Sequence, residues 1–241
     1  MKILLRLNGM HCTSCVQFIE RSLLKQAGVV SARVDLSAAW PEHYPPADLP
    51  EIAFIGRSNV GKSSMINRLV NRRHLVKTSG KPGCTRLINF FTVNDALRLV
   101  DLPGYGYAAV PEAERKRWKQ MIETYLEKRE TLRGVVLIVD IRRDADEKDL
   151  QMNHWLADRS VPVILALTKA DKLSANRRAR QLGKLCRAFG RGPDELVMFS
   201  AKTGLGLMPI WAGIDAWMQS AAGADPDANG KQCNDGLEHT P

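Results

Sequence analysis

The 241-residue sequence contains no long apolar run, and this absence excludes an integral membrane protein built from helices. No window approaches the ~18 uninterrupted apolar residues that a membrane-spanning helix needs. The N-terminal stretch "MKILLRLNGMHC" has too short an apolar part for a secretory signal, and it becomes polar too early. With 44% hydrophobic and 25% charged residues, the composition is typical of a soluble globular protein. We therefore expect a cytoplasmic protein with no membrane partner.

Cysteine and negative charge are both in short supply. The five cysteines form an odd number at irregular spacing, which argues against a disulfide framework. The 35 Lys and Arg residues outnumber the 26 Asp and Glu residues, giving a net charge of +9. Such an excess favours an anionic partner such as RNA, because Lys and Arg release counterions from phosphate backbones. A basic average does not identify that partner by itself.

Proline divides the chain into segments. Residues 38–50, "AAWPEHYPPADLP", contain four prolines, which lack the backbone donor of regular elements, so we predict a linker. Residues 1–37 before it read as strand, loop, helix and strand, a short βαβ extension. Residues 51–220 form the main domain, and residues 221–241 lack apolar periodicity and are predicted to be disordered.

Within the main domain, short β-rich runs alternate with helical patterns, which predicts an α/β fold. Several of the runs are apolar almost throughout, as expected for strands that helices cover on both faces. The prediction is a mostly parallel six-stranded sheet with helices on both sides. The six runs are "EIAFI", "LINFFTV", "LRLVD", "GVVLIVD", "VPVILAL" and "ELVMFS".

The stretch "GRSNVGKSS", residues 56–64, joins the first of these runs to a helical pattern. Gly56, Gly61, Lys62 and Ser63 fit the spacing G-x-x-x-x-G-K-[ST] of a phosphate-binding loop. The glycines let successive backbone N–H groups point at phosphate oxygens, and the lysine can reach the β- and γ-phosphates. The serine hydroxyl can bind Mg²⁺, and the helix that follows presents its positive end to the same anion.

Two further stretches fit the γ-phosphate end of a nucleotide. "LRLVDLPGYGYA" places Asp101 at the end of a strand, where its carboxylate can hold magnesium through water. The backbone N–H of Gly104 can approach the γ-phosphate closely, because glycine has no side chain. Between these motifs, "KTSGKPGCTRLINFF" offers Thr85 as a hydroxyl ligand to Mg²⁺ on a switch loop, although an ordinary loop threonine fits the spacing too.

The stretch "VPVILALTKAD" indicates which base is bound. Guanine presents two adjacent donors, N1–H and the N2 amine, and the Asp171 carboxylate can accept from both at once. A site of this kind rejects adenine, since the carboxylate would remain buried and unpaired, so it argues against an ATPase or kinase. The aliphatic part of Lys169 can cover one face of the ring. In "MFSAKTGLG", the Ala201 N–H can bond the guanine carbonyl while Ser200 shapes the turn.

These motifs, taken in order, resemble the EngB family of small bacterial GTPases over about residues 48–220. The matching stretches are "DLPEIAFIGRSNVGKSS", "PGCTRLINFF", "DLPGYGYA", "TKAD" and "FSAKTG". The resemblance implies a Ras-like domain that binds GTP and GDP with Mg²⁺ through Ser63, Thr85 and, by way of water, Asp101. The nucleotide residues that it implies are Gly56, Arg57, Ser58, Asn59, Val60, Gly61, Lys62, Ser63, Gly83, Cys84, Thr85, Arg86, Leu87, Asp101, Leu102, Pro103, Gly104, Thr168, Lys169, Ala170, Asp171, Phe199, Ser200 and Ala201.

The resemblance also implies slow conversion of GTP to GDP and phosphate by a monomer, with Lys62, Asn59 and Thr85 as catalytic residues. The implied role is in assembly of the large ribosomal subunit, with rRNA as partner, and in normal cell division and septation. Tyr105 stands where Ras-like enzymes place a water-orienting glutamine, which predicts slow intrinsic hydrolysis. Asn59 resembles the asparagine of potassium-assisted GTPases, which suggests stimulation by K⁺. Threonine at position 168, where most GTPases have asparagine, is usual in this family.

Two segments leave alternatives open. The basic helix predicted over residues 111–130 reads either as a solvated face or as a surface that touches ribosomal RNA. The N-terminal "GMHCTSC" resembles the start of a heavy-metal-associated domain, whose paired thiolates at Cys12 and Cys15 suit Cu⁺, or else Zn²⁺. Only the first strand, helix and strand of that βαββαβ fold are present. The segment is therefore a metal-binding remnant, an addition docked to the GTPase, or an accident of gene fusion or start site.

Overall fold

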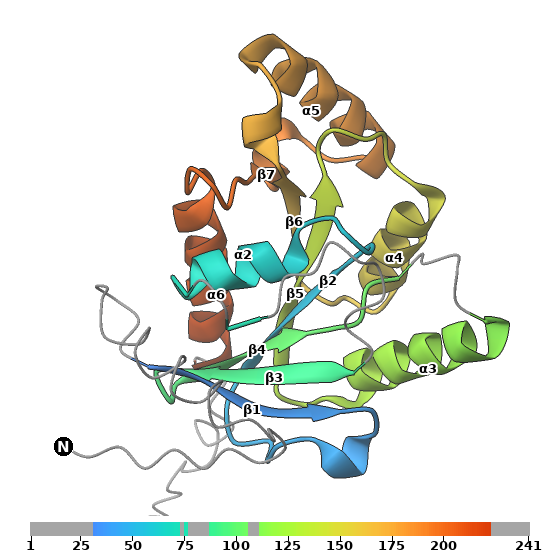
Figure 1. Cartoon of the computed structure of the whole chain (residues 1–241), viewed down its shortest axis with the longest axis vertical. Coiled ribbons are helices and arrows are strands. Elements are labelled where there is room, and N and C mark those ends of the chain that lie inside the picture. The colour runs from blue at the N-terminus through green and yellow to red at the C-terminus, as the bar shows by residue number, and fades with distance from the viewer. Residues whose placement is uncertain (1–30, 73–74, 77–86, 106–110, 223–241) are drawn as a thin grey trace, which may run out of the picture.

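The computed structural model describes residues 31–72, 75–76, 87–105 and 111–222, which form an α/β fold around one seven-stranded sheet (Figure 1). The strand order is β1-β3-β4-β2-β5-β6-β7. Strands β4, β2, β5, β6 and β7 are parallel to one another, whereas β3 is antiparallel to both β1 and β4. The strands are β1 (Ala32–Ala38), β2 (Glu51–Gly56), β3 (Ile88–Val93), β4 (Leu97–Asp101), β5 (Leu132–Asp140), β6 (Val163–Thr168) and β7 (Leu196–Met198).

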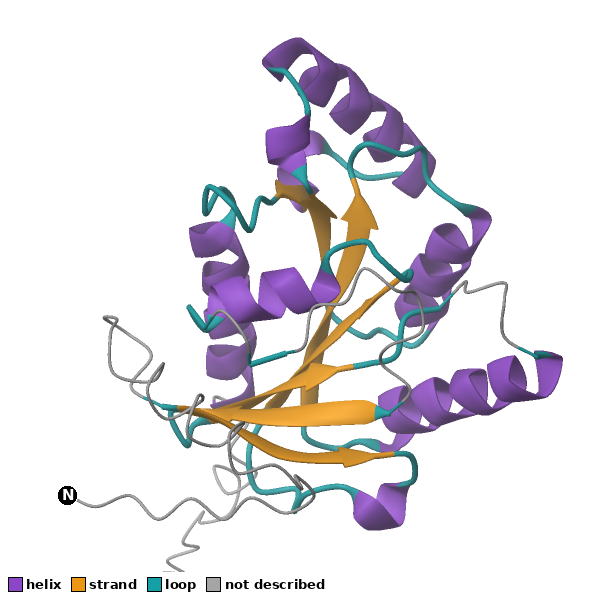
Figure 2. Ribbon diagram, in the orientation of Figure 1, coloured by secondary structure: helices purple, strands orange, loops and turns teal. Residues whose placement is uncertain are grey.

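Helices cover both faces of this sheet, so the predicted layered α/β architecture is confirmed (Figure 2). Side chains of α3, α4 and α5 pack in one core, and those of α2 and α6 pack in the other. Strand β5 contributes to both cores, because Val135 and Leu137 face one side while Val136 and Ile138 face the other. The helices are α2 (Lys62–Leu69), α3 (Glu112–Lys128), α4 (Glu147–Asp158), α5 (Ala175–Phe189) and α6 (Leu207–Ala222), with short 3₁₀ turns η1 (Pro41–His43), η2 (Ala170–Lys172) and η3 (Pro193–Glu195).

The parallel strands place the sequence motifs together. Each of the six predicted apolar runs forms a strand, β2 to β7. The stretches that carry the motifs follow the carboxyl ends of β2, β4, β6 and β7. Because these strands are parallel, their carboxyl ends meet at one edge of the sheet, which is where ligands bind in open α/β folds.

The last strand of the predicted extension, residues 1–37, pairs with the main sheet. β1 pairs with β3 along its whole length, from Ala32 opposite Val93 to Ala38 opposite Ile88. The register shifts between Val34 and Leu36, which moves later side chains to the opposite face of the sheet. The sheet therefore has a seventh strand beyond the six expected.

The segment of residues 38–50, predicted as a linker, packs against the domain. It contains η1, and the Tyr44 ring lies 5.3 Å from the Phe90 ring and 5.8 Å from the Tyr125 ring. The Arg129 side chain donates to the carbonyl of Pro45 at 2.8 Å. The prolines do prevent a long regular element, but an aromatic side chain and carbonyl acceptors fix the segment nonetheless.

Two further predictions concern the ends of the chain. Helix α6 continues to Ala222, two residues beyond the predicted end of the domain, and the rest of the predicted tail lies outside the described residues. Cys12 and Cys15 also lie outside them. No helix in the described ranges is long and apolar enough to cross a membrane.

Candidate nucleotide-binding site

The phosphate-loop stretch turns tightly between β2 and α2. Asn59 and Gly61 adopt left-handed backbone conformations, with φ of 65° and 107°. At Gly56, a Cβ atom would lie 2.5 Å from the carbonyl oxygen of Ile138, so no larger residue fits. The loop ends where α2 begins at Lys62, so its backbone and the positive end of the helix face the same space.

Two opposite charges meet beside this loop. Lys62, the first residue of α2, forms an ion pair with the fully buried Asp101 at the end of β4. Ser63 follows on α2 and is partly exposed. The Lys62 ammonium can serve a phosphate oxygen, and the Asp101 carboxylate and the Ser63 hydroxyl are oxygen ligands of the kind that a hard cation such as Mg²⁺ prefers. Across the described residues, no cluster of three or more His, Cys, Asp or Glu residues could hold another metal.

The segment after Asp101 lies directly on the phosphate loop. A Cβ atom at Gly104 would be 3.1 Å from the backbone nitrogen of Ser58, so a larger residue would fit only if the loop backbone shifted by a few tenths of an ångström. The Ser58 N–H donates to the carbonyl of Tyr105 at 3.2 Å. Any change in the position of this segment is therefore transmitted to the backbone that faces the phosphates.

The side chain of Tyr105 is held away from the loop by α4. Its hydroxyl donates to Asp149 at 2.7 Å. Burial raises the pKa of Tyr105 well above its usual value, and the Asp149 charge raises it further. Burial also raises the pKa of Asp149, and the hydrogen bond from Tyr105 only partly opposes this. Arg57 of the loop pairs with Asp146, the N-cap of α4, at 2.9 Å.

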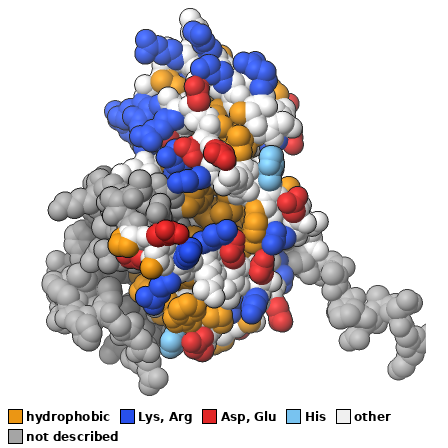
Figure 3. Space-filling view, turned by 90° about the vertical axis from the view of Figure 1, so that its right-hand side faces the viewer, with side chains coloured by type: hydrophobic (Ala, Val, Ile, Leu, Met, Phe, Trp, Pro, Cys, Tyr) orange, Lys and Arg blue, Asp and Glu red, His pale blue; other side chains and the backbone are white. Residues whose placement is uncertain are grey.

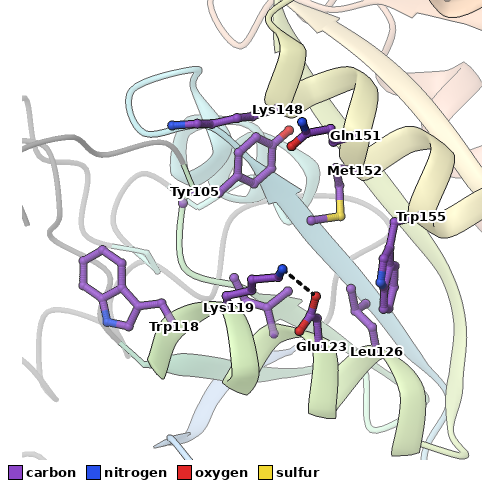
Figure 4. Close-up of a pocket in the computed structure, with 11 residues that line it drawn as sticks. Tyr105, Trp118, Lys119, Glu123, Leu126, Lys148, Gln151, Met152 and Trp155 are labelled. Atoms are coloured by element: carbon purple, nitrogen blue, oxygen red, sulfur yellow. Dashed lines mark ion pairs between the residues drawn. The ribbon is translucent and has the colours of Figure 1, made fainter. Parts of the chain in front are cut away.

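A cavity of about 420 Å³ lies between α3 and α4, next to Gly104 and Tyr105 (Figure 4). Its walls are mainly apolar, and the ion pair between Lys119 and Glu123 lies at its edge. No motif in the sequence indicates this cavity. Its apolar lining comes from Trp118, Ile122, Leu126, Met152 and Trp155.

The residues after β6 are tied to the phosphate loop. The Thr168 hydroxyl donates to the carbonyl of Val60. The Lys169 ammonium donates to the carbonyl of Asn59 at 2.6 Å and pairs with Asp140 at 2.9 Å. These contacts bring the stem of Lys169 alongside Gly61, where a Cβ atom would lie 3.7 Å from the lysine Cε.

The predicted base-recognising carboxylate is fixed by the turn that follows β7. The Ser200 hydroxyl donates to Asp171 at 2.8 Å and accepts from the Thr203 N–H at 3.2 Å. The Ala170 N–H donates to the carbonyl of Phe199 at 3.1 Å, which joins the two motifs through the backbone. Asp171 keeps 14% of its side chain exposed, so one carboxylate edge remains accessible.

Sequence reasoning missed some of the surroundings. Asp140, at the end of β5, holds Lys169 and also accepts from Arg142 at 2.9 Å. Burial acts to raise its pKa, but the hydrogen bonds from Arg142 and Lys169 outweigh burial and hold the pKa below the usual value. The signal in the sequence that could have found Asp140 was an aspartate at the end of an apolar run, as at Asp101. Gly83, Cys84, Thr85 and Arg86 lie outside the described residues, and Leu87, just before β3, is 41% exposed.

The phosphate loop lies between β2 and α2, and Thr168 and Lys169, next to the predicted base-recognising Asp171, are hydrogen-bonded to it. This arrangement defines the class of protein as a P-loop GTPase. A family model described as 50S ribosome-binding GTPase matches residues 51–169, and a heavy-metal-associated domain model matches residues 4–38. The chain belongs to the EngB family of GTP-binding proteins. It is 56% identical to the probable GTP-binding protein EngB of Citrifermentans bemidjiense over 80% of this chain and 91% of that protein.

Other relatives agree with this assignment. The probable GTP-binding protein EngB of Geobacter sulfurreducens is 53% identical over 84% of this chain and 97% of its own length. A crystal structure of a probable GTP-binding protein EngB superposes with a TM-score of 0.59 at 26% identity, covering 70% of this chain and all but 1% of that one. Aquifex aeolicus Era, at 22% identity and a TM-score of 0.53, shares the fold. The chain is therefore a GTPase, which converts GTP to GDP and phosphate.

Proposed function

We propose that this GTPase is a slow nucleotide switch in assembly of the large ribosomal subunit, required for normal cell division and septation. The matched family model, whose description names binding to the 50S ribosome, supports the ribosomal role. We further propose that the protein works as a monomer in the cytoplasm, as its resemblance to the family implies. Its partners would be GTP or GDP and the rRNA of the large subunit.

The observation that carries the nucleotide assignment is the Asp171 carboxylate, held by the Ser200 hydroxyl beside the phosphate loop. In the proposed complex, Asp171 accepts from N1–H and N2 of guanine, the Lys169 stem covers the ring, and the Ala201 N–H meets the carbonyl. A titration of Asp171→Asn tests this. The variant should lose GTP affinity and gain xanthine nucleotide, whereas wild-type protein that bound ATP as well as GTP would contradict it.

The phosphates and magnesium are assigned to the groups around Lys62. We propose that Lys62 binds the β- and γ-phosphates, while Ser63 and Thr85 bind Mg²⁺ and Asp101 holds it through water. The metal would neutralise charge on the phosphates. The meeting of an ammonium, a buried carboxylate and a hydroxyl at the start of α2 supports this set. Replacing Ser63 by alanine should weaken magnesium-dependent binding of GTP more than binding of GDP without metal.

Two residues bear on the rate of hydrolysis: Tyr105 supports a slow intrinsic rate, and Asn59 supports stimulation by K⁺. Tyr105 occupies the position of a water-orienting glutamine, and its hydroxyl is engaged by Asp149 at 2.7 Å. The exposed Asn59 is proposed to hold K⁺ near the phosphates. Hydrolysis rates in K⁺ and Na⁺ buffers of equal ionic strength test the second point. Equal rates would remove the role of potassium.

The ribosomal role is tested in cells. Depletion of the protein should produce immature large subunits in a sucrose gradient, with residual protein sedimenting alongside them. A normal gradient after depletion would refute the proposal while leaving GTP binding intact. The matched control expresses Asp171→Asn in the depleted cells without added xanthine nucleotide. It tests whether the ribosomal role needs a bound nucleotide.

The match of a heavy-metal-associated model to residues 4–38 favours one alternative, a metal-handling module coupled to the GTPase. Cys12 and Cys15 would bind Cu⁺ or Zn²⁺ as thiolates. A variant with both cysteines replaced by serine should then lose binding of Cu⁺ and change growth in copper. Unchanged metal binding and growth would leave the ribosomal switch as the whole function.

A further inference from the structure

Helix α5 carries a row of positively charged side chains on its outer face. Arg177, Arg180, Lys184 and Arg187 follow one another at spacings of three and four residues, so they lie on one side of the helix. All four are exposed. The row is about 15 Å long, because Arg177 and Arg187 are ten positions apart and each position adds about 1.5 Å along the helix. The helix contains no Asp or Glu.

The charges of this row have little local compensation. Within the part of the chain that the structure describes, Arg177, Arg180 and Arg187 form no ion pair. Lys184 pairs with Asp144 at 3.1 Å, but this aspartate is 72% exposed, and such surface pairs contribute little. Figure 3 shows Lys and Arg side chains gathered at the upper end of the molecule, which α5 forms in Figure 1.

The other candidate basic helix is different. Helix α3 interleaves its cations with four glutamates, and Lys116 pairs with Glu112 at 3.4 Å while Lys119 pairs with Glu123 at 3.7 Å. Its positive charges are thus largely balanced within the helix. Of the two helices, α5 therefore presents the stronger positive field to an anionic partner.

We propose that the outer face of α5, defined by Arg177, Arg180, Lys184 and Arg187, binds the phosphate backbone of RNA. The proposal rests on the ribosomal function above and names the surface that function would use. Three of the four cations are arginines, whose planar guanidinium groups bind phosphate oxygens in pairs. A row of cations along a helix can follow a sugar-phosphate chain without reading its bases.

The packing of α5 argues against a membrane as the partner. A helix that lies on a membrane needs an apolar face to insert between the lipids. The large apolar residues of α5 are Leu182, Leu185, Cys186 and Phe189, and all four pack against the domain core. The exposed part of the helix carries charged side chains and small alanines, which suits a solvated phosphate backbone rather than insertion between lipids.

The test compares two variants that lose the same charge. In the first, Arg177, Arg180 and Arg187 are changed to glutamine. In the control, Lys116, Arg117 and Lys128, three exposed cations of α3, are changed to glutamine. Binding of the full chain to a fluorescent single-stranded RNA is measured over a range of salt concentrations. Binding of fluorescent GDP is measured on both variants, to show that the nucleotide site is intact.

The α5 variant should bind this RNA on the order of 100-fold more weakly at about 0.1 M salt. The slope of log affinity against log salt should fall by about 2, from three lost contacts of about 0.7 each. The control should change affinity by about threefold at most, since its cations are balanced. Equal losses in the two variants, or no loss in the first, would overturn the proposal. So would an α5 variant that lost binding only to phosphatidylglycerol vesicles.

These results separate the surface from the function it serves. If RNA binding falls as expected but gradients of depleted cells stay normal, the surface stands and the ribosomal role fails. If the gradients show immature subunits and the α5 variant binds RNA normally, the role stands and the surface is elsewhere.

Discussion

Replacing Arg129 with methionine should destabilise the protein severely, because the arginine balances a buried charge. Glu51, at the start of β2, is fully buried. It accepts from Arg129 at 2.5 and 3.0 Å and from the Tyr125 hydroxyl at 2.8 Å. Burial acts to lower the pKa of Arg129, but the hydrogen bond and charge of Glu51 outweigh burial and raise it. The guanidinium therefore stays charged.

The size of the effect depends on the partners that Glu51 keeps after Arg129 is replaced. Without Arg129, Glu51 keeps one hydroxyl donor and a distant cation, Arg98, at 3.9 Å. Removing one partner of a buried ion pair costs about 3–5 kcal/mol. The lost hydrogen bond to the Pro45 carbonyl adds about 1 kcal/mol. Because Arg98 recovers part of this, we expect a net loss of about 3–4 kcal/mol in the free energy of unfolding.

Urea denaturation measures this loss directly, and the melting temperature should fall by about 6–16 °C for a domain of this size. The double variant Glu51→Gln with Arg129→Met is the internal control. It removes the unpaired buried carboxylate, Arg98 keeps its ion pairs with Asp35 and Asp48, and glutamine still accepts from Tyr125, so the double variant should recover more than half of the lost stability. A single variant that lost less than about 1 kcal/mol, or a double variant no better than the single one, would refute the reasoning.

Three further predictions concern the site and the edge of the sheet. Burial raises the pKa of Asp149, so its protonated form is favoured in the folded state and stability falls as pH rises through that pKa. Asp149→Asn should thus gain stability relative to wild type as pH rises above about 4, the ordinary pKa of an aspartate, measured by urea denaturation; a pH-independent difference would contradict this. Ser200→Ala should weaken GDP binding about fivefold in a titration, since Asp171 loses its donor, while selectivity for guanine stays. Deleting residues 1–38 removes β1 and should lower the melting temperature by more than deleting residues 1–30 does; equal effects would contradict the role of that strand.

The sequence predicts the phosphate loop and the sheet because their signals are local. Gly56 stands where a Cβ atom would meet the carbonyl oxygen of Ile138, and Gly61 stands where the backbone has a positive φ. The apolar runs that form β2 to β7 are covered on both faces, so each run is visible without knowledge of its partner.

Contacts between distant positions could not be predicted in this way. The bond from Tyr105 to Asp149 joins residues 44 positions apart, and the aspartate was recognisable only as part of a helix start. Tyr44 packs on Phe90 from a segment whose prolines indicated a linker. In each case the partner is chosen by the packing of helices and strands on the sheet, which no single stretch of sequence encodes.

Strand β1 belongs both to the segment that matches the heavy-metal-associated model and to the sheet of the GTPase. Residues 32–38 fall within the match to the heavy-metal-associated model, and they also pair with β3 of the GTPase sheet. A strand has two edges, and β3 occupies one edge of β1. A metal-binding unit that included Cys12 and Cys15 could therefore use only the other edge, and it would be joined to the GTPase through the hydrogen bonds of the sheet itself. Separating β1 from the GTPase would break its pairing with β3 at the edge of the sheet.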